Sequence, residues 1–96
     1  MEAKPILNFG FDINLYEDEV KMKGYCNDLF VILPDLSKFR VCFYDPIRLG
    51  QDVADEGYIA ESGLIVINDV TKNNMENAVY KLWLDGYFEG LKPLEK

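Results

Sequence analysis

The chain has 96 residues, of which 49% are hydrophobic and 14% are aromatic, and its formal net charge is −7. This length supports one domain and is too short for two, so we expect residues 1–96 to form a single domain around one core. The negative charge disfavours binding to nucleic-acid phosphates and to anionic membranes, because both attract basic surfaces.

The N-terminus and the two cysteines bear on localisation. The first five residues, MEAKP, lack the charged and apolar regions of a signal peptide, and no apolar run approaches the length of a membrane span. We therefore predict a cytoplasmic protein. Cys26 and Cys42 are then expected to be reduced and buried, although neighbouring strands could bring them together as a disulfide. The chain has no histidine, so an ordinary zinc site of cysteine and histidine ligands is excluded.

Alternating apolar residues predict strands in the N-terminal half. The odd positions from Leu7 to Leu15 are all apolar, which predicts one long strand. The acidic residues 17–19 are predicted to form a turn, and a second strand over 20–23 is expected to return as the hairpin partner. Two further strands, over 28–33 and 38–44, are joined by a short turn and would extend the sheet as an antiparallel meander.

Helix signals dominate the second half. Asp45 followed by a proline is typical of an N-cap and first helical position, and it predicts a short helix over Pro46–Glu56. Another strand is predicted over 64–67. Thr71 is a good N-cap for a final helix, whose apolar stripe is expected to face the core and which should stop at Gly86.

This order of elements predicts the fold class. We expect an α+β fold with a mostly antiparallel sheet of about five strands and two helices packed on one face. Beyond the last helix, Tyr87, Phe88 and Leu91 are expected to fold back on the core.

The sequence shows no catalytic or metal-binding motif. Without histidine, neither a Ser-His nor a Cys-His pair can form, and Thr71 occupies a helix cap. The segment 45–56 has the frame of an EF-hand calcium loop, but Ile47 and Leu49 stand where calcium needs oxygen ligands. We therefore expect no enzymatic activity, no cofactor and no metal.

Acidic residues concentrate in the middle of the chain. From Asp45 to Asp69 there are six carboxylates and one cation, Arg48, so this stretch carries −5 of the total −7. Tyrosine is a favoured interface anchor, and carboxylates beside it suit a partner rich in Lys and Arg. The alternative is a solvated helix face between two ordinary half-buried tyrosines. The predicted partner-binding residues are Tyr44, Asp45, Asp52, Asp55, Glu56, Tyr58 and Glu61.

Part of the chain resembles a known class of inhibitor. The stretches FYDPIRL (43–49) and GLIVI (63–67), followed by the final helix with its aromatic pair, resemble the C-terminal half of small immunity proteins. Such proteins are encoded beside the toxins of bacterial polymorphic-toxin and contact-dependent growth inhibition systems. The resemblance covers about half of the chain and lies in the order of elements. It implies tight binding to a cognate toxin domain, often a basic nuclease, whose active site is blocked.

Three other roles fit the sequence. A phage-type nucleic-acid mimic would use the same acidity to inhibit a nucleoprotein effector. A structural domain would self-associate through an open sheet edge. A small enzyme would need a cleft that the sequence does not signal. For the leading interpretation we expect a monomer or a weak homodimer that contacts neither nucleic acid nor a membrane directly.

Overall fold

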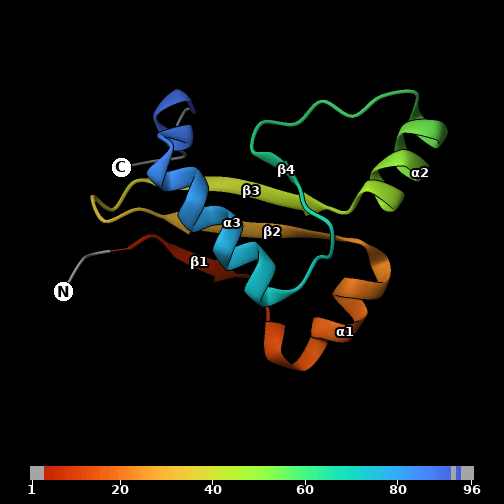
Figure 1. Ribbon diagram of the computed structural model, residues 1–96, viewed down its shortest axis with the longest axis horizontal. Coiled ribbons are helices and arrows are strands. Elements are labelled where there is room, and N and C mark those ends of the chain that lie inside the picture. Colours follow the sequence, from red (N-terminus) through yellow and green to blue (C-terminus); the bar gives the residue numbers. More distant parts are fainter. Residues whose placement is uncertain (1–3, 92, 94–96) are drawn as a thin grey trace.

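The computed structural model describes residues 4–91 and residue 93, which form a sheet and three α-helices (Figure 1). Residues 1–3, which contributed to the localisation argument, lie outside the described residues. In chain order the elements are β1 (Ile6–Phe9), α1 (Ile13–Lys23), β2 (Tyr25–Ile32), β3 (Lys38–Tyr44), α2 (Pro46–Glu56), β4 (Leu64–Val66), α3 (Lys72–Leu84) and a 3-10 helix, η1 (Tyr87–Gly90).

The four strands follow one another across the sheet in the order β1-β2-β3-β4. β1, β2 and β3 are antiparallel neighbours, whereas β4 runs parallel to β3, with Cys42 opposite Leu64 and Tyr44 opposite Val66. A parallel pair needs a long crossover, and residues 45–63, including α2, supply it. The predicted fold class is confirmed, since the protein is α+β with a mostly antiparallel sheet.

The first helix is the main difference from the sequence prediction. The expected strand over 7–15 ends at Phe9, and the expected turn over 17–19 and second strand over 20–23 are both part of α1. Ile13 and Val20, seven residues apart, are buried, whereas Leu15 is 70% exposed. Seven residues make two helical turns, so Ile13 and Val20 lie on the same side of the helix and face the core. Leu15 lies on another side and faces solvent.

Capping residues explain why this segment is helical. The Asp12 carboxylate accepts a hydrogen bond of 3.1 Å from the backbone N–H of Asn14. At the other end, Gly24 adopts φ 77° and donates its N–H to the carbonyl of Val20 at 3.0 Å. These two local stops outweigh the period-two alternation, which has no sheet partner beyond Phe9 among the described residues.

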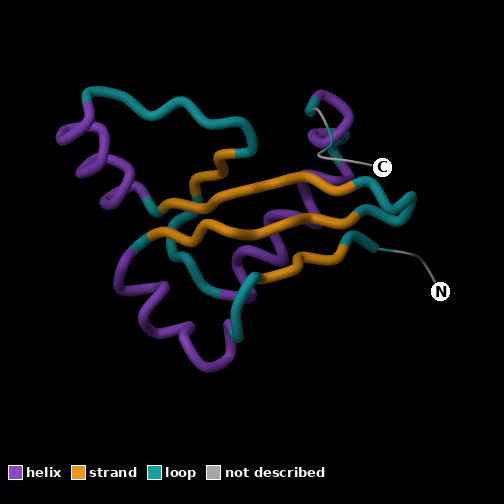
Figure 2. Tube along the Cα trace, turned by 180° about the vertical axis from the view of Figure 1, so that it is seen from behind, coloured by secondary structure: helices purple, strands orange, loops and turns teal. Residues whose placement is uncertain are grey.

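The core lies between one face of the sheet and two helices. The two helices that contribute buried side chains to it are α1 and α3. The predicted packing of helix 46–56 on the sheet is wrong, because α2 has no buried residue. α3 crosses one face of the sheet, and the view from behind shows that no helix of the described residues lies over the opposite face (Figure 2). The most deeply buried side chains are those of Leu29, Val31, Val41, Phe43, Val70, Met75, Val79 and Phe88.

The final helix agrees with its prediction. Thr71 caps it by accepting a hydrogen bond of 3.2 Å from the N–H of Asn74. Glu17 on α1 accepts a second one, of 2.8 Å, from the N–H of Lys72, which ties the two core helices together. Phe88 is buried, and its neighbours at 87 and 91 pack against the core, as expected. Among the described residues no helix has the length and apolar character that crossing a membrane requires.

Candidate protein-binding site

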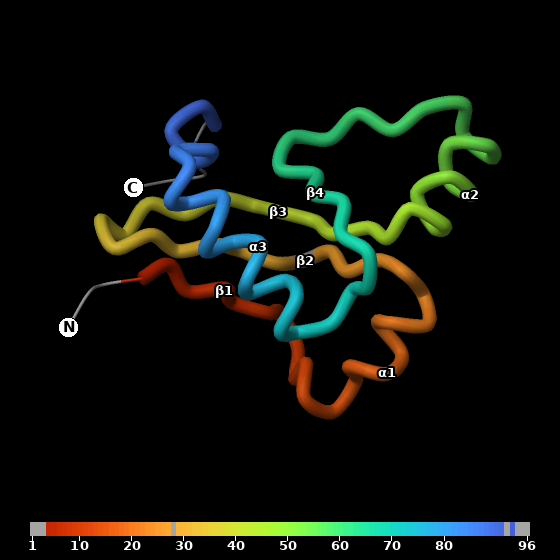
Figure 3. The backbone as a smooth tube through the Cα atoms, viewed as in Figure 1, coloured from red at the N-terminus to blue at the C-terminus, as the bar shows by residue number. Residues whose placement is uncertain are grey.

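α2 lies apart from the core, beyond the end of the sheet (Figure 3). Its predicted bounds, Pro46–Glu56, are confirmed. The Asp45 carboxylate caps its start by accepting a hydrogen bond of 2.7 Å from the N–H of Arg48, and Gly57, at φ 89°, ends it. Local capping therefore forms this helix, although none of its side chains is buried and Ile47 is 73% exposed.

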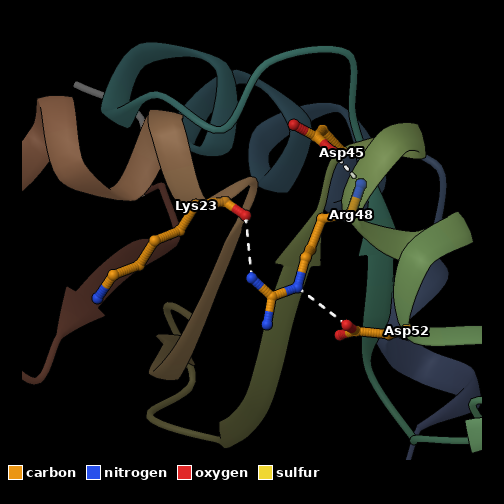
Figure 4. Close-up of polar contacts among 4 residues, drawn as sticks. All are labelled: Lys23, Asp45, Arg48 and Asp52. Atoms are coloured by element: carbon orange, nitrogen blue, oxygen red, sulfur yellow. Dashed lines mark hydrogen bonds and ion pairs between the residues drawn. The ribbon is translucent and has the colours of Figure 1, made fainter. Parts of the chain in front are cut away.

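Arg48 attaches α2 to the rest of the protein (Figure 4). Its Nε donates to Asp52 Oδ1 at 2.9 Å, one helical turn away, and its Nη1 donates to the carbonyl of Lys23 at 3.4 Å. The guanidinium also lies 4.3 Å from the centre of the Tyr25 ring, which in turn stacks on Tyr44 with centroids 5.9 Å apart. One cation thus joins α2 to the end of α1 and to the start of β2.

A second contact reinforces this attachment. The backbone N–H of Asp45 donates to the carbonyl of Gly24 at 2.8 Å. The side chain of Asp45 lies so close that a Cβ on Gly24 would come within 2.6 Å of Oδ2. α2 is therefore held at its N-terminal end by polar contacts, while apolar burial holds α1 and α3.

An acidic hollow opens between β3, α2 and the segment that leads to β4. Its volume is about 290 Å³. Five of the seven predicted partner-binding residues line it, brought from positions up to 17 residues apart in the sequence. The lining residues are Tyr44, Asp52, Glu56, Tyr58, Ile59, Ala60 and Glu61.

The other two predicted residues lie outside the hollow. Asp45 serves as the helix cap already described, so its carboxylate has a structural contact. Asp55 is exposed on α2 and does not line the hollow. Asp52 is half-buried and forms an ion pair of 2.9 Å with Arg48, which partly offsets its charge. Of the acidic residues in the hollow, Glu56 and Glu61 are the exposed ones.

Glu61 has a buried partner that sequence reasoning missed. The Cys42 thiol donates to Glu61 Oε2 at 3.2 Å. Burial, followed by this hydrogen bond and the carboxylate charge, raises the pKa of Cys42 from 9.0 to about 12. The raised pKa disfavours the thiolate of Cys42, which is the nucleophilic form of a cysteine. Cys26 and Cys42 are both buried and neither is part of a disulfide, as the sequence predicted.

The electrostatic environment of Tyr44 shows the sign of the local field. Its pKa is raised, first by burial and then by the negative charges of Asp52 and Glu61, while Arg48 acts in the opposite direction. The carboxylates therefore outweigh the one nearby cation. A positively charged side chain entering the hollow would be attracted, and an anion would be repelled.

The hollow places acidic and tyrosine side chains where they can contact a cationic group. Within residues 4–91 and 93, no cluster of three or more Cys, Asp or Glu side chains is arranged to hold a metal ion. Tyr25 and Arg48 belong to the site as positioning residues, and the sequence did not mark Tyr25. The only sequence signal for Arg48 is its i, i+4 spacing to Asp52.

Fold and site together define an acidic α+β protein with an exposed helix and an acidic, tyrosine-lined hollow beside it. Comparisons with protein-family models, with curated proteins and with solved structures find no match.

Proposed function

We propose that this chain is a cytoplasmic immunity protein that binds the basic domain of a cognate bacterial toxin and blocks its active site. The observation that carries the proposal is the convergence of Tyr44, Tyr58 and three carboxylates on one hollow. Such a surface suits Lys and Arg side chains that would otherwise contact nucleic-acid phosphates. In this proposal the protein is a binding partner without enzymatic activity, a cofactor or a metal.

The proposed mechanism divides between charge and contact. The carboxylates of Glu56 and Glu61 would speed association with a basic surface, and the effect would weaken as salt rises. Tyr58, which is 72% exposed, would provide a buried anchor in the complex and slow its dissociation.

The first experiment is a pull-down from the source cell with the tagged protein as bait, followed by mass spectrometry. Recovery of one basic protein encoded next to this chain would support the proposal. A large nucleoprotein effector encoded elsewhere would favour the nucleic-acid mimic instead. Recovery of nothing, from cells shown to express the neighbouring genes, would refute a dedicated partner.

Charge reversal then tests the surface. Asp55→Lys combined with Glu56→Lys should slow association with the recovered partner at least tenfold at low salt. The matched control is Asp18→Lys combined with Glu19→Lys, because these residues are also exposed on a helix and the net charge changes equally. Equal association rates for the two double variants would show that the α2 side is not the interface.

Self-association is a second candidate because both edge strands carry exposed apolar side chains. Ile6 on β1 and Val66 on β4 are 61% and 45% exposed. Unpaired edges template strand addition. Size-exclusion chromatography at two protein concentrations distinguishes this role, since a shift to a larger species at the higher concentration would support it.

A further inference from the structure

α2 turns its polar side toward the protein and its apolar side toward solvent. Arg48 and Asp52 make the attachment and are 33% and 23% exposed in their side chains. Ile47 and Val53, on the other side of the helix, are 73% and 38% exposed. At 100° per residue, one arc of the helix surface carries Pro46, Ile47, Gly50, Val53 and Ala54.

This orientation is the reverse of an ordinary surface helix. An amphipathic helix normally buries its apolar stripe against the core. Single exposed apolar residues are common, but a contiguous exposed strip marks an interaction surface. We define the strip formed by the five residues of this arc as the outer face of α2.

Gly50 gives a second, independent indication. Glycine inside a helix weakens folding relative to alanine by about fivefold in the equilibrium constant. A Cβ built on Gly50 would meet nothing within 4 Å, so no contact within the described structure requires glycine there. The absence of a side chain at this point instead permits the close approach of another backbone.

We propose that the outer face of α2 is the docking surface for an apolar ridge on a basic protein partner, with Gly50 at the point of closest approach. This inference rests on the proposed function and adds a second contact surface to the acidic hollow. Glu56 and Asp55 lie on the two flanks of the outer face, just beyond Leu49 and Gln51, so Lys or Arg on either side of the matching ridge would be attracted.

Size and charge select this occupant. α2 has 11 residues and is therefore about 16 Å long, too small to supply the roughly 800 Å² per partner of a stable interface by itself. The partner must also cover the acidic residues beside the helix, which requires positive charge. A second copy of this chain, with a net charge of −7, would be repelled there, and an anionic lipid surface would be repelled in the same way.

Site-specific crosslinking in the source cell tests the inference. A photoreactive phenylalanine analogue replaces Ile47 in one variant, Tyr58 in a second and Leu15 in a third. Leu15 is the matched control because it is 70% exposed on a helix at a different place in the fold. The expected result is one basic protein crosslinked from positions 47 and 58 but not 15, through a peptide of apolar residues flanked by Lys or Arg.

The other outcomes separate the two proposals. A basic partner crosslinked from 58 but not 47 would overturn the docking inference and leave the proposed function standing. No crosslink from either position would overturn both. A crosslink from 47 to a second copy of this chain, or recovery of the protein with phosphatidylglycerol vesicles, would replace the partner by self-association or by lipid.

Gly50→Leu provides a test in which folding and binding change in opposite directions. Leucine is a better helix former, so the urea midpoint should rise. Its side chain would obstruct the approach of the partner and should weaken binding at least tenfold. Unchanged affinity in this folded variant would overturn the role of Gly50.

Discussion

Gly63 connects the segment after α2 to β4, and its replacement by alanine should be strongly destabilising. It is buried and adopts φ 81°, a conformation that residues with a Cβ rarely adopt. An added Cβ would overlap the carbonyl oxygen of Arg40 and lie 3.3 Å from the Cα of Val41. Both atoms belong to the backbone of β3, so neither can rotate away.

The expected loss follows from these two effects. The left-handed conformation alone costs about 1 to 2 kcal/mol with a side chain. Relieving the overlap must move β4 away from β3, which endangers the 3.1 Å bond from the N–H of Cys42 to the carbonyl of Gly63. Each lost backbone bond of this kind costs about 1 kcal/mol. We expect a total of about 3 kcal/mol, a large part of the stability of a small domain.

Gly57→Ala is the matched control. Gly57 also has a positive φ, of 89°, but a Cβ there meets nothing within 4 Å. Its replacement should cost only the conformational term, about 1 kcal/mol. Urea unfolding followed by the fluorescence of Trp83, the single tryptophan, measures both variants. If Gly63→Ala loses no more stability than Gly57→Ala, the inference that the backbone at position 63 lies against that of β3 is refuted.

Two further predictions concern the polar contacts. Folding raises the Cys42 pKa from 9.0 to about 12, so between these pH values the folded protein keeps a proton that the unfolded chain loses. The stability that Cys42 contributes is therefore fully present below pH 9 and is lost as pH rises toward 12. Above pH 9 the free energy of unfolding should fall by about 1.4 kcal/mol per pH unit more steeply than that of the Cys42→Ala variant. Urea titrations at several pH values measure both proteins, and an equal dependence on pH in the two would contradict the prediction. Arg48→Met removes the bond to Asp52 and the stacking on Tyr25, and should speed amide exchange in α2 at least tenfold while lowering global stability by about 1 kcal/mol or less. Unchanged exchange would mean that other contacts hold the helix.

Helices with clear signals at both ends were predictable. α2 lies between Asp45 and Gly57, and α3 between Thr71 and Gly86, as expected. α1 also has both signals, in Asp12 and Gly24, but its apolar positions satisfy a period of two and a period of seven at once. The alternation favoured a strand. Only the fold shows that the neighbouring strand pairs with this segment no further than Phe9.

The candidate site was predictable in composition but not in its contacts. The density of carboxylates after Tyr44 indicated the segment, and five of the seven residues meet in one hollow. The sequence did not indicate that Tyr25, from β2, would stack on Tyr44 and hold Arg48. It also did not indicate that Cys42 would donate to Glu61.

Caps, turns and the apolar stripe of α3 act within a few residues, so the sequence by itself determined these elements and the acidic character of the second half. Only the tertiary structure decided that β4 runs parallel to β3 and that α2 turns its apolar side to solvent. The same holds for Glu61, which meets a thiol 19 residues away. These features depend on strand register and on which backbone groups remain to be paired once the core has formed, and no local pattern encodes either.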